Sequence, residues 1–367
     1  MKKQIALIGV TGFGASHLFH LHNLAEAGLV DIAAAVVINP EQAAESLAIL
    51  KTHNTRIYPD ANAFFAAEAG RIDLVCLPVG IAAHEPLTLT ALEHGMNVLV
   101  EKPASGSAES VKRMIAAEKK SGKFVAVGYQ NGYAPEIHFI KRLLLSGRLG
   151  GICYSTGIVC WPRDDAYYQR NAWAAKRSVN GIKVLDSPLN NACAHYINLL
   201  LFLNGSGFDR CAAAVNVSGE VLRARPEIEM FDACDANYTL DNGKNCRIML
   251  AHCCTERVNP IIKIVCERGT VIWHGNAAWS VTDNDNTVIA SGTAVHPGET
   301  MFRTVLSRLD DPAQTVYTLE NSLAQTQAVE LLDKTLPITP AEARYENGIY
   351  VVDGLVQKYK TAFGGEI

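Results

Sequence analysis

The chain has 367 residues, of which 49% are hydrophobic and 19% charged, with a formal net charge of -4 at pH 7. This length predicts two domains, because a single hydrophobic core seldom organises so many residues. The slight acidity argues against a nucleic-acid partner, and no apolar run reaches the ~18 residues of a membrane-spanning helix. The first strand is expected to begin by Gln4, which leaves no room for a signal peptide. Ten scattered cysteines without paired metal-ligand spacing predict free thiols in a reducing cytoplasm and no metal site.

Short apolar runs alternate with helical patterns over residues 1–128. The runs are dense in Val, Ile, Leu and Ala, which is typical of strands covered on both faces. The expected strands are 5–9, 32–38, 74–78, 98–101 and 124–128. Asn39-Pro40-Glu41-Gln42 combines an N-cap, a proline at the first helical position and a capping-box glutamine, so it predicts a helix start. This repetition predicts a doubly wound parallel sheet, hence an α/β domain over residues 1–128.

The pattern changes after about residue 150. The sequence predicts a helix over 191–203, a strand-rich stretch over 211–290, and helices over 300–309, 319–334 and 350–359. Alternating residues over 236–240 and 246–250, joined by Asp241-Asn242-Gly243-Lys244, indicate a hairpin. We therefore expect a substrate-binding and oligomerisation α+β domain over 129–346, with a large, mostly antiparallel open sheet. A C-terminal helix within 347–367 is expected to pack back on the first domain.

A glycine-rich turn, Gly9-Val10-Thr11-Gly12-Phe13-Gly14, follows the first strand and opens a helix. Gly9 would form the tight turn, and Gly14 would let helix and strand pack closely. The helix N-terminus would then present free N–H groups and partial positive charge to a pyrophosphate. Thr11 occupies the position of the second glycine of the Rossmann fingerprint, and Gly12 beside it restores some freedom. The alternative is a structural turn that binds no nucleotide.

The second element of a dinucleotide fingerprint is missing. An acidic residue at the end of the second strand would bind the ribose of NAD, but that place reads Val36-Val37-Ile38-Asn39. No arginine stands there for the extra phosphate of NADP. Asn39 either hydrogen-bonds a ribose or caps the next helix. The sequence therefore leaves NAD and NADP open.

The fourth expected strand ends in Glu101-Lys102-Pro103. Groups just beyond the carboxyl ends of parallel strands face the ligand crevice, so Glu101 and Lys102 are expected near the nicotinamide. Pro78 ends the third expected strand and joins this set. His84 opens the following helix, where it either caps the helix or contacts the ligand.

Several motifs resemble the Gfo/Idh/MocA (glucose–fructose oxidoreductase / inositol dehydrogenase) family. They are the Gly9–Gly14 turn, His94-Gly95-Met96-Asn97-Val98-Leu99-Val100-Glu101-Lys102-Pro103, Val127-Gly128-Tyr129-Gln130 with Pro135, and His195-Tyr196-Ile197-Asn198-Leu199-Leu200 with Leu203-Asn204-Gly205. The resemblance covers most of the chain. It implies an NAD- or NADP-dependent dehydrogenase acting on a secondary alcohol of a sugar or cyclic polyol. It also implies a homo-oligomer, either a dimer or a tetramer.

The resemblance assigns the catalytic roles to Lys102, which activates the substrate hydroxyl, and His195, its proton partner. The family often places acids four residues before and three after this histidine, where this chain has Asn191 and Asn198. Asp186 either supplies a missing carboxylate or caps a turn before Pro188.

Further residues are assigned to ligand binding. Gln130 and Tyr129 are expected to line the nicotinamide or substrate face. Trp173, with Asp186, Asn191 and His195, is expected to contact the substrate, although packing is an equal alternative for the stretch around Trp173.

The remaining histidines are not assigned to the site, and two alternative activities remain open. His17, His20 and His22 are expected to be ordinary residues of the first helix. His252 is expected in the core, with the substrate cleft as its alternative. Two other activities remain open on the resemblance: an NAD-dependent glycosidase that oxidises its sugar transiently, and a non-catalytic regulator that senses dinucleotide or sugar.

Overall fold

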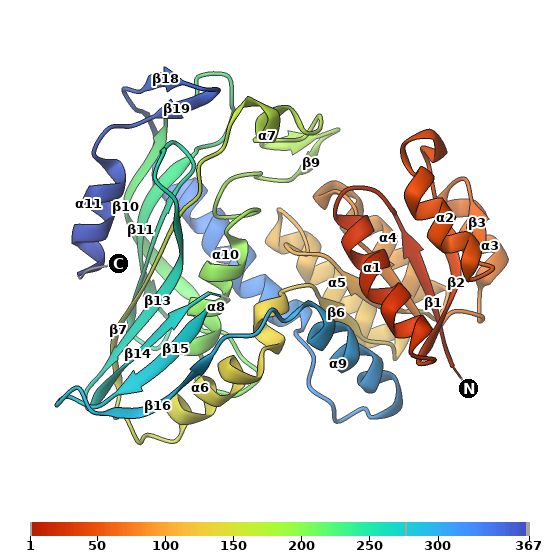
Figure 1. Ribbon diagram of the computed structural model, residues 1–367, viewed down its shortest axis with the longest axis horizontal. Coiled ribbons are helices and arrows are strands. Elements are labelled where there is room, and N and C mark those ends of the chain that lie inside the picture. The colour runs from red at the N-terminus through yellow and green to blue at the C-terminus, as the bar shows by residue number, and fades with distance from the viewer. Residues whose placement is uncertain (1, 276, 365–367) are drawn as a thin grey trace. The chain divides into compact units, whose positions relative to one another are not determined.

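The computed structural model describes residues 2–275 and 277–364. The chain divides into two compact units (Figure 1). The first unit comprises Met1–Ser105, Glu109–Tyr133 and Pro297–Ser322, and the second comprises Gly106–Ala108, Ala134–His296 and Leu323–Ile367. The sequence places a single boundary after residue 128. In the structure, a later segment also returns to the first unit.

The first unit is built on a parallel sheet, which over the described residues has six strands in the order β3-β2-β1-β4-β5-β6. The strands are β1 (Lys3–Ile8), β2 (Val30–Val36), β3 (Arg56–Tyr58), β4 (Leu74–Leu77), β5 (Asn97–Val100) and β6 (Val125–Val127). The helices are α1 (Phe13–Glu26), η1 (Pro40–Gln42), α2 (Ala44–Thr52), α3 (Ala61–Glu68), α4 (Ile81–Glu93), α5 (Ala108–Ser121), η2 (Gln130–Tyr133) and α9 (Gly298–Asp310). The predicted doubly wound sheet is confirmed. The edge strand β3, only three residues long and largely exposed, was missed because it has no apolar run.

The central strands of this sheet are covered on both faces, as Figure 1 shows. All four residues of β4 are buried, and Ile5 and Leu7 of β1 are 0% exposed. Burying such a side chain stabilises the fold by about 1.5–3 kcal/mol. The sheet is therefore a rigid base for the loops at its carboxyl edge.

The predicted helix start at Asn39 is wrong in its details. Asn39 precedes η1, a single 3-10 turn, and its side chain makes no capping hydrogen bond. The α-helix begins only at Ala44. With φ -119° and ψ 78°, the backbone of Asn39 is outside the extended region from which an N-cap side chain bonds the helix N–H groups.

The second unit contains a mixed sheet, which over the described residues has nine strands in the order β16-β15-β14-β13-β7-β12-β11-β10-β17. The strands are β7 (Ile152–Cys160), β10 (Ala214–Arg223), β11 (Ala233–Leu240), β12 (Asn245–Ala251), β13 (Val258–Cys266), β14 (Gly269–His274), β15 (Ala278–Thr282), β16 (Val288–Thr293) and β17 (Ile338–Pro340). Two pairs, β7 with β12 and β10 with β17, are parallel, and the other pairs are antiparallel. The predicted open, mostly antiparallel sheet and its β11–β12 hairpin are confirmed.

Helices and two short hairpins complete this unit. The helices are α6 (Pro135–Leu145), α7 (Asp165–Gln169), α8 (Ala194–Asn204), α10 (Leu319–Thr335) and α11 (Leu355–Phe363), and the hairpins are β8 (Ser178–Val179) with β9 (Ile182–Lys183) and β18 (Arg344–Glu346) with β19 (Ile349–Val351). The prediction of a helix over 191–203 corresponds to α8, which begins three residues later. No helix in the described part of the chain combines the length and the apolar character needed to cross a membrane.

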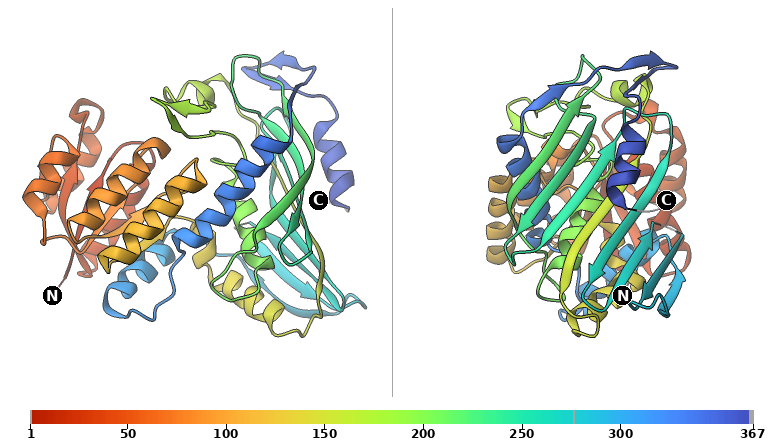
Figure 2. Two further views of the ribbon diagram at one scale, coloured as in Figure 1. Left: turned by 180° about the vertical axis from the view of Figure 1, so that it is seen from behind. Right: turned by 90° about the vertical axis from the view of Figure 1, so that its left-hand side faces the viewer.

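The last helix, α11, lies on the nine-stranded sheet of its own unit (Figure 2). Leu355, Tyr359 and Phe363 form its buried stripe and pack against Ile158 and Met249 of the sheet. The expected C-terminal helix is present but begins five residues later than predicted, and the expectation that it packs on the first domain is wrong. Residues 349–351 pair as β19 instead, and the i, i+4 spacing of the stripe fits the apolar surface of the sheet.

Candidate active site

The glycine-rich turn of the first unit has the geometry that dinucleotide binding needs. Gly9 has φ +90° and Gly12 φ +56°, a region of backbone conformation that favours glycine. A Cβ on Gly14 would lie 2.4 Å from the carbonyl oxygen of Gly9, so only glycine lets α1 approach β1 this closely. The backbone N–H groups of Thr11 and Gly12 have no hydrogen-bond partner among the described backbone groups. The turn therefore fits a phosphate group at the N-terminus of α1.

Three further residues of the predicted cofactor set, Phe13, Pro78 and Asn39, belong to the same unit as this turn. Phe13 is 53% exposed at the first position of α1. Pro78 is buried and lies against the turn, 3.6 Å from the position of a Cβ on Gly14. Asn39 is exposed, and its side chain makes no hydrogen bond within the described residues. Its amide is thus available to a ribose hydroxyl.

Glu101 is held by two groups of its own unit. Its Oε1 lies 2.9 Å from Nε2 of His17, and its Oε2 accepts a hydrogen bond of 3.2 Å from the backbone N–H of Lys102. A Cβ on Gly128 would lie 2.4 Å from Oε1, so a glycine is needed behind the carboxylate. Both oxygens of Glu101 have a partner within the first unit, so the carboxylate fixes the backbone beside Lys102.

Lys102 follows β5 at the carboxyl edge of the parallel sheet, and its side chain is half-buried. Gln130 opens η2 beyond β6, the neighbouring strand, and is also half-buried. The structure therefore brings both residues to the same edge as the glycine-rich turn.

Two residues of the predicted set are interior. His84 is 1% exposed, and its ring nitrogens lie 2.8 Å from the carbonyl oxygen of Pro103 and 3.0 Å from that of Val79. Burial lowers the pKa of His84. It lies inside α4 and bonds the backbone, so neither the cap nor the ligand contact is supported. Tyr129 is 1% exposed with its ring 5.6 Å from that of Tyr317, so its expected place on the substrate face is wrong.

In the second unit, His195 lies in the first turn of α8 and is half-buried. Asp186 is 3% exposed, and its carboxylate accepts hydrogen bonds from Nδ2 of Asn191 at 2.6 Å and from Arg170 at 3.0 Å. The turn before α8 is bonded by Ser187, whose Oγ accepts from the N–H of Asn190. Asp186 therefore does not cap that turn; it fixes Asn191.

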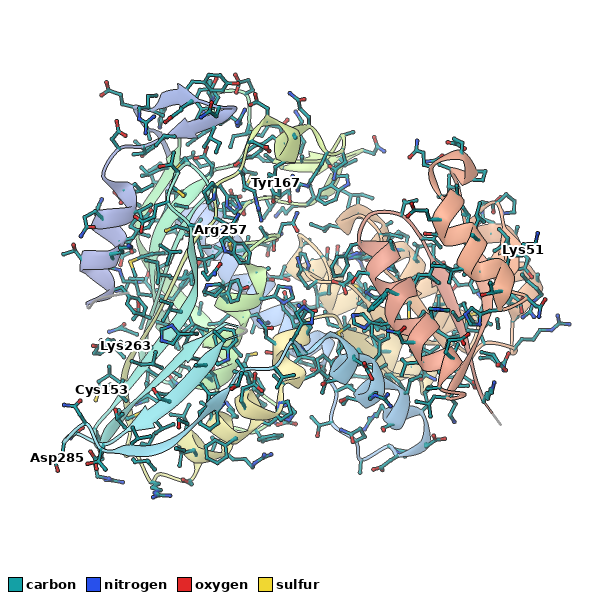
Figure 3. All side chains as sticks on the ribbon, in the orientation of Figure 1. Lys51, Cys153, Tyr167, Arg257, Lys263 and Asp285 are labelled. Atoms are coloured by element: carbon teal, nitrogen blue, oxygen red, sulfur yellow. The ribbon has the colours of Figure 1, made fainter. Side chains whose placement is uncertain are left out.

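Two arginines and three aromatic rings gather in front of α8. We name this set (Trp161, Arg163, Tyr167, Arg170 and Trp173) the arginine–aromatic cluster. Cζ of Arg170 lies 4.0 Å from the ring centroid of Tyr167 and 5.3 Å from that of Trp173. Cζ of Arg163 lies 4.7 Å from Tyr167 and 5.6 Å from Trp161. Tyr167, labelled in Figure 3, lies on α7 at the centre of these contacts.

The cluster combines ring faces with cationic donors, the usual equipment of a site for a polar ring. Trp173 was predicted from the sequence, whereas Arg163 was missed. The signal available was the Trp161-Pro162-Arg163 run directly after a buried strand.

His252 lies beneath this cluster and belongs to the core, as expected. It is 2% exposed, its Nδ1 lies 2.9 Å from the carbonyl oxygen of Trp161, and its ring meets Tyr167 edge to face. Burial, with a smaller effect from Arg163, lowers the pKa of His252 to about 3. The neutral ring donates from Nδ1, and its buried Nε2 has no hydrogen-bond partner among the described residues.

A separate group in the first unit offers three metal-type ligands: His22, Glu26 and His53. Nδ1 of His22 lies 2.8 Å from Nε2 of His53, so His22 pairs with a residue outside its own helix. Cys253 and Cys254 are buried in the apolar core of the second unit. Burial raises the pKa of the Cys254 thiol to about 12, so the pair is inert at neutral pH.

Both halves of the chain match known protein families. Residues 3–129 match an oxidoreductase family with an NAD-binding Rossmann fold. Residues 137–272 match the GFO/IDH/MocA C-terminal domain.

Inositol 2-dehydrogenases are among the similar sequences. One from Corynebacterium glutamicum (strain R) is 26% identical over 156 residues, which are 42% of this chain and 44% of the relative. Another from Pseudomonas fluorescens (strain SBW25) is 32% identical over 145 residues, which are 39% of this chain and 42% of the relative. The chain thus spans less than half the length of these relatives.

Solved structures share the fold of the chain. The WlbA dehydrogenase from Bordetella pertussis, in complex with NADH and UDP-GlcNAcA, has a TM-score of 0.74 at 20% identity, covering 92% of this chain and 100% of that one. Levoglucosan dehydrogenase, in complex with NADH and levoglucosan, has a TM-score of 0.77 at 14% identity, covering 91% and 97%. Together with the two matched domains, the fold shows that the chain belongs to the GFO/IDH/MocA oxidoreductase family.

Proposed function

We propose that the protein transfers a hydride between a nicotinamide dinucleotide, NAD or NADP, and a secondary alcohol of a sugar or cyclic polyol. The cofactor supplies a nicotinamide ring whose C4 exchanges the hydride. The alcohol carbon loses the hydride, and the hydroxyl proton passes to a base of the protein. The similarity to inositol 2-dehydrogenases supports this substrate class.

The first unit provides the residues for the dinucleotide. The N–H groups of Thr11 and Gly12 would bind phosphate oxygens at the N-terminus of α1. Asn39 would bind a ribose hydroxyl, and Gln130 the nicotinamide. No acidic side chain occupies the position of Asn39, so the choice between NAD and NADP depends on affinity measurements.

The observation that carries the proposal is the fixed Glu101 beside Lys102. A carboxylate bonded to His17 on one side and to the N–H of Lys102 on the other holds the backbone of the lysine in one place. Lys102 would then hold the substrate hydroxyl and take part in moving its proton. Precise placement of such a group contributes about 100- to 10,000-fold to a rate.

In the second unit, His195 would exchange the proton of the substrate hydroxyl. Asn191, fixed by Asp186, takes the place of one family acid, and Asn198, 1% exposed, takes the place of the other. Trp173 would contact the sugar ring.

The test begins with cofactor binding. The purified protein is titrated with NAD, NADH, NADP and NADPH by fluorescence quenching, and turnover is then screened with inositols and aldoses. Lys102→Met should lose about 100- to 10,000-fold in turnover with a nearly unchanged cofactor Kd. Lys51→Met, on the exposed face of α2 (Figure 3), is the matched control and should behave as the wild type.

Two results would contradict the proposal. Failure to bind any of the four dinucleotides would favour a protein that senses sugar without chemistry. Unchanged turnover in Lys102→Met would remove the role of this lysine.

Two further properties complete the proposal. The ten cysteines form no disulfide in the structure, which fits a reducing cytoplasm. The face of the nine-stranded sheet that carries α11 also exposes Tyr154, and we infer self-association through this face. Light scattering after size exclusion should give the mass of a dimer or tetramer, and a monomer at micromolar concentration would contradict it.

A further inference from the structure

Arg163 presents a guanidinium group that has no acidic partner. No ion pair or side-chain hydrogen bond within the described residues involves it, and its Nε is buried and unbonded. The terminal nitrogens are unbonded too, but they are not enclosed, since the side chain is only half-buried. Two planar donors therefore reach solvent beside the rings of Trp161 and Tyr167.

The other charges of the arginine–aromatic cluster cancel. Arg170 donates to Asp186 at 3.0 Å, and the carboxylate is buried. This pair contributes no net charge. The positive charge of Arg163 remains unbalanced within the cluster.

The two carboxylates next to Arg163 in the chain are engaged elsewhere. Oδ1 of Asp164 accepts a hydrogen bond of 3.0 Å from the N–H of Tyr167 and caps α7. Asp165 accepts a hydrogen bond of 2.6 Å from Arg225. Arg163 thus has no carboxylate partner from its neighbours in the chain.

His252 beneath the cluster does not change this balance. Because its pKa is lowered to about 3, the ring is neutral at pH 7. It adds no second positive charge. The site therefore carries a single excess charge, held by a group that binds carboxylates in a bidentate manner.

We propose that Arg163 binds the carboxylate of an acidic sugar, a uronic or aldonic acid, and that this selects the substrate. The inference rests on the proposed function, because it names the substrate class of that same site. The rings of Trp161, Tyr167 and Trp173 would contact the apolar faces of the sugar. One free guanidinium matches the planar shape and the single charge of a carboxylate, whereas it would leave one charge of a phosphate dianion unbalanced.

The experiment compares acidic and neutral sugars of the same ring. Equilibrium binding is measured by calorimetry for potassium glucuronate against glucose and galacturonate against galactose, with the preferred dinucleotide present. Turnover is measured with the same four compounds. Glucose 6-phosphate is measured in the same way, because a phosphate group can also bind an arginine.

The variant Arg163→Met should weaken binding of the acids by about 10- to 100-fold and change neutral sugars by less than about 3-fold. Arg163→Lys should keep part of the preference, because it keeps the charge but not the bidentate geometry. Arg148→Met is the matched control. Arg148 is an exposed arginine that precedes β7, while Arg163 follows it, so the nine-residue strand β7 lies between the two.

Several results would overturn the inference. These are equal binding of acids and neutral sugars, an equal loss of both in Arg163→Met, or tighter binding of glucose 6-phosphate than of glucuronate. Selective binding of the acids without turnover of any sugar would support Arg163 while contradicting the proposed hydride transfer. Binding and catalysis are thus tested separately.

Discussion

His17 on α1 and Glu101 at the end of β5 share a hydrogen bond of 2.9 Å in the interior of the first unit. The two residues are 1% and 5% exposed. The bond links the helix that follows the glycine-rich turn to the residue that precedes Lys102. The end of β5, directly before Lys102, is therefore fastened to α1 by this contact.

Replacing Glu101 should show this link. Glu101→Ala should lower the free energy of unfolding by about 1–3 kcal/mol, because the buried Nε2 of His17 would lose its carboxylate partner. Turnover should fall while the cofactor Kd changes little, since Lys102 would lose its anchor. Urea unfolding and steady-state kinetics measure the two effects. Glu109→Ala, at an exposed position of α5, is the control, and wild-type turnover in Glu101→Ala would show that the anchor is not needed.

The close approach at the glycine-rich turn predicts a second loss. Gly14→Ala would bring a methyl group to 2.4 Å from the oxygen of Gly9, so α1 must shift. Dinucleotide affinity should fall by at least about 10-fold, which corresponds to about 1.4 kcal/mol. Fluorescence titration measures it. Gly207→Ala, where the new methyl meets only side-chain atoms at 3.4 Å or more, should bind as the wild type does. Equal affinities of all three proteins would mean that the turn does not bind the cofactor.

His252 makes stability depend on pH. Its pKa is about 3 in the folded protein, against 6.5 in an unfolded chain. Between these values the unfolded chain binds a proton that the folded protein excludes, so stability is lost as the pH falls below about 6.5. The slope is about 1.4 kcal/mol per pH unit. His252→Asn keeps a donor for the carbonyl of Trp161 and should lose about 2 kcal/mol less than the wild type between pH 7 and 5. Urea unfolding at the two pH values tests this, and parallel losses would contradict it.

Glu118 on α5 should make stability depend on pH in the opposite direction, with a loss at high pH. Burial raises the pKa of Glu118 to about 7, above its ordinary value of 4.5. The folded protein holds the proton of Glu118 more tightly than the unfolded chain does. The stabilisation from this proton is therefore complete below pH 4.5 and is lost as the pH rises through 7. Glu118→Gln can still accept the hydrogen bond from the N–H of Val125. The variant should be more stable than the wild type by about 1–3 kcal/mol at pH 8 and similar at pH 4.5. Thermal unfolding at both values measures this; the same difference at both would contradict it.

The sequence correctly predicted those parts of the fold and the site that depend on residues adjacent in the chain. The Gly9–Gly14 turn and the strand ending before Lys102 could be read because a glycine turn and a buried strand are properties of short segments. The same holds for the β11–β12 hairpin, whose turn residues lie between its strands.

The wrong predictions for site residues concern side chains whose surroundings depend on tertiary contacts. Tyr129 is interior because Tyr317 packs on it, and His84 is interior because Pro103 and Val79 surround its ring. The local sequence pattern does not predict such contacts. Arg163 was missed for a related reason. It is a candidate because the nearby carboxylates bond to other groups, and those bonds cannot be read from the sequence.

The first unit is assembled from segments that the ribosome makes far apart. Phe302 of α9 is 1% exposed, and its ring lies 5.0 Å from that of His17, although most of the second unit is translated between them. A nascent chain that ends before residue 297 cannot complete the core around α1. The cofactor-binding unit therefore reaches its final packing only after most of the chain has left the ribosome, so its cotranslational folding is not a simple N-terminal-first process.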